Sequence, residues 1–288
     1  LGLYISGKTA MTGPPLILFF LSLSLAMKST QNLKGFSFTV LIFAAVSLSM
    51  FYPQPMVQLG EFQLKKLIVP LLQIIMFGMG TAMSFNDFYG VIKMPKGVLV
   101  GLVCQFIIMP LLGFSLATLF NFPAEIAAGV VLIGSSPSGL ASNVMAYLAK
   151  ANVALSVTLT AVATVVAPFM TPLLMKYFAG AFVPIDFLAM MLSIVKMVIL
   201  PVVFGLVFNH FFHGKAKWLD KAMPIVSMTA IALIIVIISA AGRDSLLSIG
   251  ILLIVAAIFH NLMGYLLGYW GCRLLKMKEQ DCRTIALE

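Results

Sequence analysis

Charged residues are scarce in this chain, and this scarcity excludes a soluble globular protein. Only 9% of the 288 residues are charged, whereas 61% are hydrophobic and the mean hydropathy is +1.10. Such a composition cannot provide a hydrated surface around an apolar core. The short alternating segments of a transmembrane β-barrel are missing too, because the apolar runs are about 17 to 25 residues long. Helices of this length cross the ~30 Å hydrocarbon layer, so the sequence predicts an all-α, multi-pass membrane protein.

Cysteine is also rare, which leaves no basis for a disulfide framework or a thiolate metal site. The three cysteines, Cys104, Cys272 and Cys282, lack the spacing of metal ligands. Cys104 lies in the middle of an apolar segment, where packing is the expected role of a free thiol.

Carboxylates are almost absent from the apolar segments. Every aspartate and glutamate falls in a loop or at a segment end except Glu288, which follows the apolar start of a further segment. A carboxylate in a membrane is costly unless it is paired or binds a cation. Glu288 is therefore a candidate functional residue, with a position at the membrane interface as the alternative.

Nine apolar segments follow residue 35, of which the last begins near Thr284 and is cut short. The eight complete spans are expected at residues 36–52, 64–84, 97–119, 124–149, 152–177, 187–211, 223–241 and 246–274. Residues 1–35 are expected to be an N-terminal extension, and we interpret Met27 as the natural start, although residues 14–27 also resemble a signal-type segment. Because the ninth span is truncated, we expect a chain that ends at Glu288 to be poorly stable and inactive.

Basic residues set the expected orientation. With Met27 as the start, twelve lysines and arginines fall on one side of the membrane and four on the other. The larger group is Lys28, Lys34, Lys93, Lys96, Lys150, Lys215, Lys217, Lys221, Arg273, Lys276, Lys278 and Arg283; the smaller is Lys65, Lys66, Lys176 and Arg243. Since positive loops stay in the cytoplasm, we expect a cytoplasmic N-terminus in a cell inner membrane. The net charge of +9 then reflects topology and not nucleic-acid binding.

The fourth span contains a polar interruption, Gly134-Ser-Ser-Pro-Ser-Gly-Leu-Ala-Ser-Asn143. Pro137 removes a backbone donor, and glycines allow conformations that other residues avoid. The helix is expected to stop and restart, with Ser142 and Asn143 at the N-cap of the second half. Such a break persists in a bilayer only where protein, ions or water satisfy its freed backbone groups, so it marks a binding site. The new helix N-terminus favours an anion and the freed carbonyls favour a cation, whereas the alternative is a kink without a ligand.

The fifth span adds a stripe of hydroxyl groups. Ser156, Thr160 and Thr164 recur every four residues and share one helix face, whereas Thr158 lies on another. Hydroxyls at this spacing often bond only to the carbonyl four residues earlier, or hold helices together. Beside the Ser142–Asn143 pair, these hard oxygen donors favour an alkali cation.

A weak internal repeat relates the third and eighth spans. The segment Gln105–Phe114 aligns with His260–Tyr269, which places Gln105 opposite His260. The two spans are five apart, and an odd number of spans per repeat inverts the second copy. The sequence thus predicts a five-plus-five inverted repeat, residues 36–178 and 179–288, in which a discontinuous ninth helix matches the broken fourth and is incomplete here. Both Gln105 and His260 could equally be polar packing residues.

At these residues the chain resembles the bile acid:sodium symporter family, over about residues 36–288. The segments that carry the resemblance are Ile74–Gly80, Pro123–Ala127, Ser142–Ala149, Asn152–Val157 and Met191–Val198. The resemblance implies ten spans in two inverted repeats. A panel domain would contain spans one, two, six and seven, and a core domain would contain the others, with the broken fourth and ninth helices crossing.

The resemblance also implies ligands. One sodium ion would bind Ser142, Asn143, Ser156, Thr160 and Glu288, and a second would bind Gln105 and Glu288 with backbone and a glutamine beyond the chain end. The substrate would lie against Ser138, Gly139, Leu140, Ala141, Asn143 and His260. The implied activity is sodium-coupled symport of an organic anion by alternating access, with sodium as coupling ion, no enzymatic activity and a monomeric protein.

One departure from the family pattern leaves the substrate open. The family usually has Gly-Gly-Thr before the Ser-Asn pair, whereas this chain has Ser138-Gly139-Leu140. The loss of that hydroxyl affects the substrate cavity and not the sodium ligands. The resemblance is therefore compatible with a bile acid or with a small carboxylate such as pantoate or pyruvate.

Two alternative functions remain open from the sequence. A metalloid or proton antiporter on the same scaffold would be expected to have a cysteine in the fourth span or an aspartate pair, and the sequence has neither. An intramembrane serine protease would pair Ser138 with His260, but this leaves Asn143, Ser156 and Thr160 unexplained.

Overall fold

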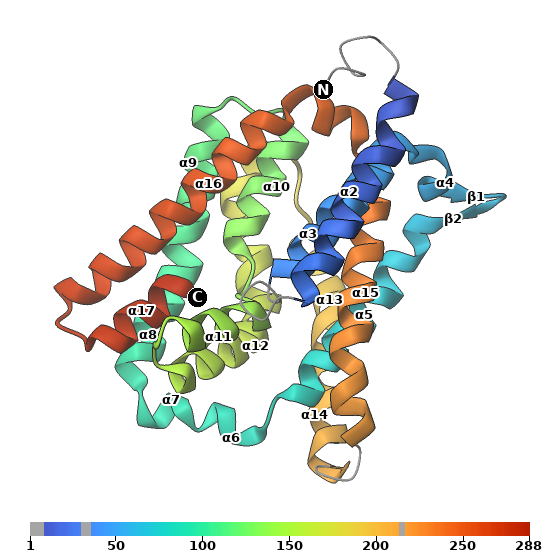
Figure 1. Ribbon diagram of the computed structural model, residues 1–288. Coiled ribbons are helices and arrows are strands. Elements are labelled where there is room, and N and C mark those ends of the chain that lie inside the picture. The colour runs from blue at the N-terminus through green and yellow to red at the C-terminus, as the bar shows by residue number, and fades with distance from the viewer. Residues whose placement is uncertain (1–8, 30–35, 213–216) are drawn as a thin grey trace. The chain divides into compact units, whose positions relative to one another are not determined.

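The computed structural model describes residues 9–29, 36–212 and 217–288 (Figure 1). All regular secondary structure in the described part is helical except one short hairpin. Contacts divide the chain into two compact units, residues 1–78 with 214–250 and residues 79–213 with 251–288. Lys34 and Lys215, which contribute to the predicted orientation, lie outside the described residues.

The first unit is built on a pair of apolar helices, α2 (Thr9–Ser29) and α3 (Ser37–Phe51). Two serines join them reciprocally: the Ser24 hydroxyl lies 2.8 Å from the Ser37 carbonyl, and the Ser37 hydroxyl lies 2.9 Å from the Ser24 carbonyl. In a bilayer the hydrophobic effect does not drive helices together, so hydrogen bonds between small polar residues help to hold them. The helix α15 (Lys217–Ala241) packs on α3. The predicted extension thus includes a helix.

A small hairpin lies between the first and second spans. After the short helix α4 (Pro53–Val57), strands β1 (Gln58–Leu59) and β2 (Phe62–Gln63) pair in antiparallel register. Gly60 turns the chain at φ +59°, in the left-handed region that glycine adopts without strain. The second span follows as η2 (Leu64–Leu67) and α5 (Ile68–Ala82), which continues into the second unit.

The second unit contains the third, fourth and fifth spans. The third span is α8 (Pro95–Val103), a π-helical turn η3 (Cys104–Ile108) and α9 (Met109–Leu119). The fourth is divided into α10 (Ala124–Ser135) and α11 (Leu140–Leu148), and the fifth is α12 (Val153–Phe178) followed by η4 (Ala179–Ala181). Short helices α6 (Phe85–Phe88) and α7 (Gly90–Lys93) precede them.

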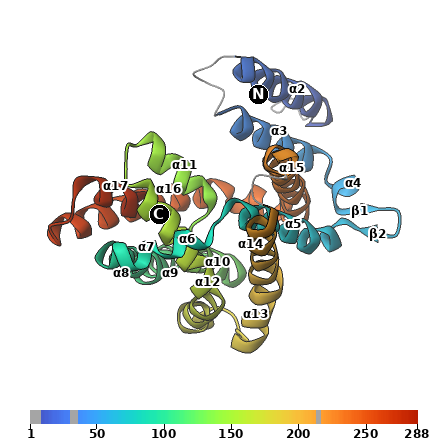
Figure 2. The ribbon, with the colours of Figure 1, turned by 90° about the horizontal axis from the view of Figure 1, so that it is seen from below.

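The rest of this unit comes from the C-terminal half of the chain. The sixth span is α13 (Phe187–Ile194), a second π-helical turn η5 (Val195–Ile199) and α14 (Leu200–Phe212). The eighth span, α16 (Arg243–Leu274), begins in the first unit and continues here. The chain closes with α17 (Glu279–Leu287), which contacts α11 and α12 and lies beside α11 in both views (Figures 1 and 2).

The predicted spans agree with the helices to within a few residues at most ends. Six helices of the described part are long and apolar enough to cross a membrane, whereas α3 and α10 are shorter. The prediction that the last helix begins near Thr284 is wrong, because α17 begins at Glu279. Glu279 and Asp281 occupy its first turn, where acidic side chains suit the helix dipole but conceal the helix from an apolar-run search.

The grouping of the sixth span differs from the panel that the resemblance implies. The contacts place this span in the second unit, together with the fifth. Phe187 packs edge to face on Phe169 of α12, with ring centroids 5.9 Å apart. Near the other end of the sixth span, Gly80 approaches the backbone of Val202 so closely that a side chain at residue 80 would collide with it.

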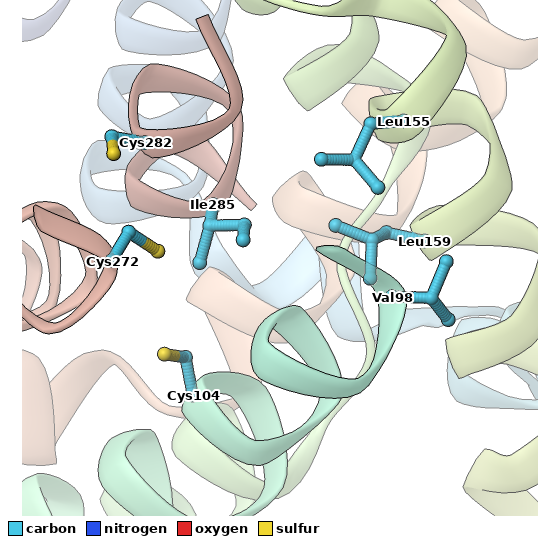
Figure 3. Packing of buried hydrophobic residues seen from close by; sticks show 7 residues of the cluster. All are labelled: Val98, Cys104, Leu155, Leu159, Cys272, Cys282 and Ile285. Carbon is cyan, nitrogen blue, oxygen red and sulfur yellow. The ribbon is translucent and has the colours of Figure 1, made fainter. Parts of the chain in front are cut away.

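A cluster of buried side chains holds α17 in place. It consists of Val98, Cys104, Leu155, Leu159, Cys272, Cys282 and Ile285, contributed by α8, η3, α12, α16 and α17 (Figure 3). The prediction that Cys104 has a packing role is confirmed, and the other two cysteines are also free and buried. This cluster packs the last turns of α17 against α12, and this packing positions Glu288.

Candidate functional site

The fourth span is broken as predicted. Helix α10 ends at Ser135 and α11 begins at Leu140, and the capping residues Ser136 and Gly139 are both extended. Pro137 cannot donate a backbone hydrogen bond, which accounts for the interruption.

The protein itself supplies donors to the freed carbonyls of the break. The Thr171 hydroxyl donates to the Ser135 carbonyl at 2.7 Å, and the Gln105 side-chain amide donates to the Ser136 carbonyl. Gln105 lies in the π-helical turn η3, a distortion that is frequent at functional sites. Sequence reasoning missed Thr171, although it lies seven residues after Thr164 and so continues the predicted hydroxyl stripe.

The restart of the helix corrects one prediction. Gly139, and not Ser142 or Asn143, is the N-cap of α11, with extended backbone angles of φ −111° and ψ 169°. Ser142 lies in the first turn, where its hydroxyl is 2.7 Å from the Gly139 carbonyl. This position turns Ser142 and Asn143 towards α12 and α17.

The Glu288 carboxylate is the centre of the site. The Ser138 hydroxyl donates to its Oε2 at 2.5 Å, the Thr160 hydroxyl lies 3.1 Å from the same oxygen, and the Ser142 hydroxyl lies 2.9 Å from Oε1. The Ser156 hydroxyl also contacts Oε1. These four hydroxyls come from the break, α11 and α12, so three segments converge on one carboxylate.

These hydroxyl groups lie near more acceptor oxygens than their protons can satisfy. Ser156 lies 2.7 Å from Asn143 Oδ1 as well as next to Glu288. Thr160 faces Asn143 Oδ1 at 3.4 Å and the Ser156 carbonyl at 3.1 Å in addition to Glu288. Since each hydroxyl carries one proton, lone pairs of several oxygens are left directed into the group. An excess of hard oxygen lone pairs beside a carboxylate suits a cation of the alkali or alkaline-earth type.

Burial strengthens this electrostatic argument. The side chains of Ser156 and Thr160 are 0% and 2% exposed, and Glu288 is half-buried. A charge in such surroundings is weakly screened, so a carboxylate needs a nearby cation or several donors. Thr164, by contrast, is equally buried but donates to the Thr160 carbonyl at 2.7 Å, which is the packing role that the sequence left open.

A cavity of about 90 Å³ adjoins the carboxylate. Gln105 and Glu288 both line it, together with Asn261 and Tyr265 of α16. The structure therefore brings Gln105 and Glu288 to one space, which is large enough for a few water molecules or a hydrated ion.

The predicted substrate contacts are divided between two places. Ser138 turns towards Glu288, while Gly139 and Ala141 are exposed at the start of α11. Leu140 begins that helix, but its side chain lies outside the described residues.

His260 lies elsewhere. It is only 3% exposed, and its Nε2 is 3.0 Å from the Met109 carbonyl, in the packing of α16 on α9. The two groups that a serine protease would need to pair thus have different partners, Glu288 for Ser138 and Met109 for His260.

Comparison with known proteins gives consistent matches. The model of the Sodium Bile acid symporter family matches residues 69–259. The chain is 38% identical over 253 residues to an uncharacterized sodium-dependent transporter of Bacillus subtilis, a match that covers 88% of this chain and 77% of that protein. It is 36% identical over 223 residues to the ileal sodium/bile acid cotransporter of Mus musculus, covering 76% of this chain and 64% of the relative.

The match to a plant relative covers a smaller share of that relative. The Arabidopsis thaliana protein named "Probable sodium/metabolite cotransporter BASS1, chloroplastic" is 35% identical over 217 residues, covering 75% of this chain and 54% of that protein. The chain thus spans from about half to three quarters of the length of these relatives. The family and these relatives are transporters and not enzymes, which excludes the intramembrane protease. With the family model covering most of its length, this multi-pass membrane protein belongs to the Sodium Bile acid symporter family.

Proposed function

We propose that this protein is a sodium-coupled symporter of an organic anion. The observation that carries the proposal is the surplus of acceptor oxygens around Glu288, which the four hydroxyl protons of Ser138, Ser142, Ser156 and Thr160 cannot all satisfy. A sodium ion would bind these oxygens and Asn143 Oδ1, and it would compensate the carboxylate charge.

A second sodium ion would bind in the cavity between Gln105 and Glu288. The cavity adjoins the same carboxylate, so one negative charge would serve two cations. Binding would also turn the Gln105 side chain from the Ser136 carbonyl to the ion, which couples ion occupancy to the shape of the break.

The anion would meet the exposed N-terminus of α11. Gly139 and Ala141 present backbone there, and a helix N-terminus favours negative charge. Ser138, Leu140 and Asn143 complete the proposed substrate side, whereas the buried His260 packs on the Met109 carbonyl instead. A bile acid is one substrate class, and a small carboxylate such as pantoate or pyruvate is the other, because Leu140 replaces a hydroxyl residue of the family pattern.

Alternating access would follow from movement of two helix groups around this fixed site. We propose that the chain contains two inverted five-helix repeats, with the N-terminus in the cytoplasm of the cell inner membrane and a monomer as the transporting unit. Sodium would favour the conformation in which the break accepts the anion. The sodium ions and the anion would then be released on the other side of the membrane.

Uptake into proteoliposomes tests the proposal. The intact protein is reconstituted, and entry of labelled taurocholate, pantoate and pyruvate is compared under inward sodium and inward potassium gradients of equal ionic strength. We expect one anion to accumulate with sodium only, and Glu288→Gln to abolish this accumulation. Glu125→Gln, which changes an exposed carboxylate at the start of α10, serves as the matched control. Equal uptake under both gradients, or full activity of Glu288→Gln, would contradict the proposal.

A further inference from the structure

A second polar contact joins α17 to α12, one turn before the Glu288 group. The Thr284 side chain is 0% exposed, and its hydroxyl accepts the backbone N–H of Asn152 at 2.9 Å. The same hydroxyl lies 3.1 Å from the Asn152 carbonyl and 3.0 Å from the Gln280 carbonyl, to one of which it donates. We call this pair the Asn152–Thr284 contact.

Asn152 is held from three sides. Its Oδ1 accepts the Leu155 N–H at 3.1 Å, which caps the start of α12. Its Nδ2 donates to Asp281 Oδ1 at 2.8 Å. One residue thus fixes the N-terminus of α12 and the first turn of α17 at the same time.

The spacing of these residues relates the contact to the ion site. Asn152 precedes Ser156 by four residues, and Thr284 precedes Glu288 by four residues. Four residues are about one helical turn, or ~6 Å of rise, on each helix. The two helices therefore run parallel here, and the pairing of Asn152 with Thr284 sets the pairing of Ser156 with Glu288 one turn later.

A small slip would separate the ion ligands. If α17 moved by one residue against α12, Glu288 would rotate by about 100° and shift by about 1.5 Å. It would then no longer face Ser156 and Thr160. The apolar cluster around Ile285 does not exclude such a slip by itself, because apolar packing is less directional than hydrogen bonding.

We propose that Asn152 and Thr284 are positioning residues that set the register of α17, and thereby the affinity of the Glu288 site for sodium, without touching the ion. The inference rests on the proposed function and adds two residues to it. Positioning groups behind metal ligands typically change affinity by about 10- to 100-fold when they are removed.

The test measures the sodium concentration that gives half-maximal uptake, and half-maximal thermal stabilisation, in the intact protein. Thr284→Val keeps the shape and removes the hydroxyl, so we expect the half-saturating sodium concentration to rise about 10-fold. Thr284→Ser keeps the hydroxyl and should stay within about twofold of the wild type. Thr164→Val is the matched control, since Thr164 is as buried but bonds only within its own helix in the described structure.

A second pair of variants covers the case in which Thr284→Val does not fold. Asn152→Asp keeps a capping oxygen but places two carboxylates face to face, and we expect weaker sodium binding. Adding Asp281→Asn restores a donor and an acceptor, and should recover most of the affinity.

The outcomes separate the two proposals. A lowered melting temperature with unchanged sodium half-saturation in Thr284→Val and Asn152→Asp would mean a structural role only and would overturn the inference. A wild-type protein without any sodium response would overturn the proposed function, and the inference with it. Loss of affinity in Asn152→Asp without recovery in the double variant would also count against the register argument.

Discussion

The side-chain amide of Gln105 donates a hydrogen bond to the backbone carbonyl of Ser136, which joins the π-helical turn of the third span to the break in the fourth. This hydrogen bond has two structural effects. It satisfies a carbonyl that the interrupted helix leaves without its usual partner, and it holds Gln105 beside the cavity next to Glu288. A change at Gln105 should therefore affect both the break and the proposed second sodium site.

Gln105→Met is expected to lower stability by about 1 kcal/mol, because the Ser136 carbonyl loses its donor in a weakly hydrated place. It should also reduce the Hill coefficient of sodium-dependent uptake towards 1, because one proposed site is lost. Thermal unfolding and sodium titration of uptake measure the two effects. Ser115→Ala is the control, since this exposed hydroxyl bonds only to the Leu111 carbonyl in the described structure. An unchanged Hill coefficient would exclude Gln105 as a ligand.

Ser156→Ala should weaken sodium binding more than a substitution elsewhere on the same helix face. The variant removes a hydroxyl that contacts both Asn143 Oδ1 and the Glu288 carboxylate. A hydrogen-bonding group next to a charge contributes about 1.4 kcal/mol or more, so we expect at least ~10-fold higher half-saturating sodium. Sodium-dependent thermal shift measures this, with Thr164→Val as control. Equal affinities of the two variants would place the sodium ion elsewhere.

The break could be predicted because Pro137 and its neighbouring glycines act locally. The hydroxyl stripe could be predicted because helical periodicity alone places Ser156 and Thr160 on one face. Glu288 stood out for a similar reason, since a carboxylate in an apolar stretch is costly wherever it lies. Each of these signals depends on residues that are near one another in the sequence.

The remaining features depend on contacts between distant residues. Thr171 and Thr284 are ordinary hydroxyl residues until the fold places them beside the Ser135 carbonyl and the Asn152 N–H. The restart of α11 at Leu140 was also missed, because serine and asparagine are the usual N-caps, whereas the N-cap is Gly139, which has no side chain to mark it. Hydropathy likewise missed the polar first turn of α17.

Gly134→Ala should disrupt the packing at the end of α10. A Cβ atom at Gly134 would collide with the backbone carbonyl of Met109, which cannot move aside like a flexible side chain. Overpacking of this kind costs about 1–3 kcal/mol. Gly129→Ala on the same helix is the matched control, because its added methyl meets no described atom within 4 Å and should be neutral or stabilising by up to ~1 kcal/mol. Thermal unfolding of both variants tests this prediction, and equal melting temperatures would contradict the close approach of α9 and α10.

Glu279 should make the stability of α17 depend on pH. A hydrogen bond from Tyr269, and next to it the Arg283 guanidinium, lower the pKa of this carboxyl below its usual value. A carboxyl whose pKa is lower in the folded protein stabilises it at pH values above the unfolded pKa of about 4.3. The stabilisation is lost as the pH falls through the folded value, because both states are then protonated.

We therefore expect Glu279→Gln to melt at a lower temperature than the wild type at pH 7, and this difference to shrink as the pH falls below about 4. Glu125→Gln, at an exposed carboxylate of α10, controls for the change of net charge. Because the Glu279 side chain is 40% exposed and its ion pairs are screened by water and salt, the effect should be small and should decrease further at high ionic strength. A difference that grows on acidification would have the opposite sign and would mean that the Glu279 carboxyl stabilises α17 in its protonated form.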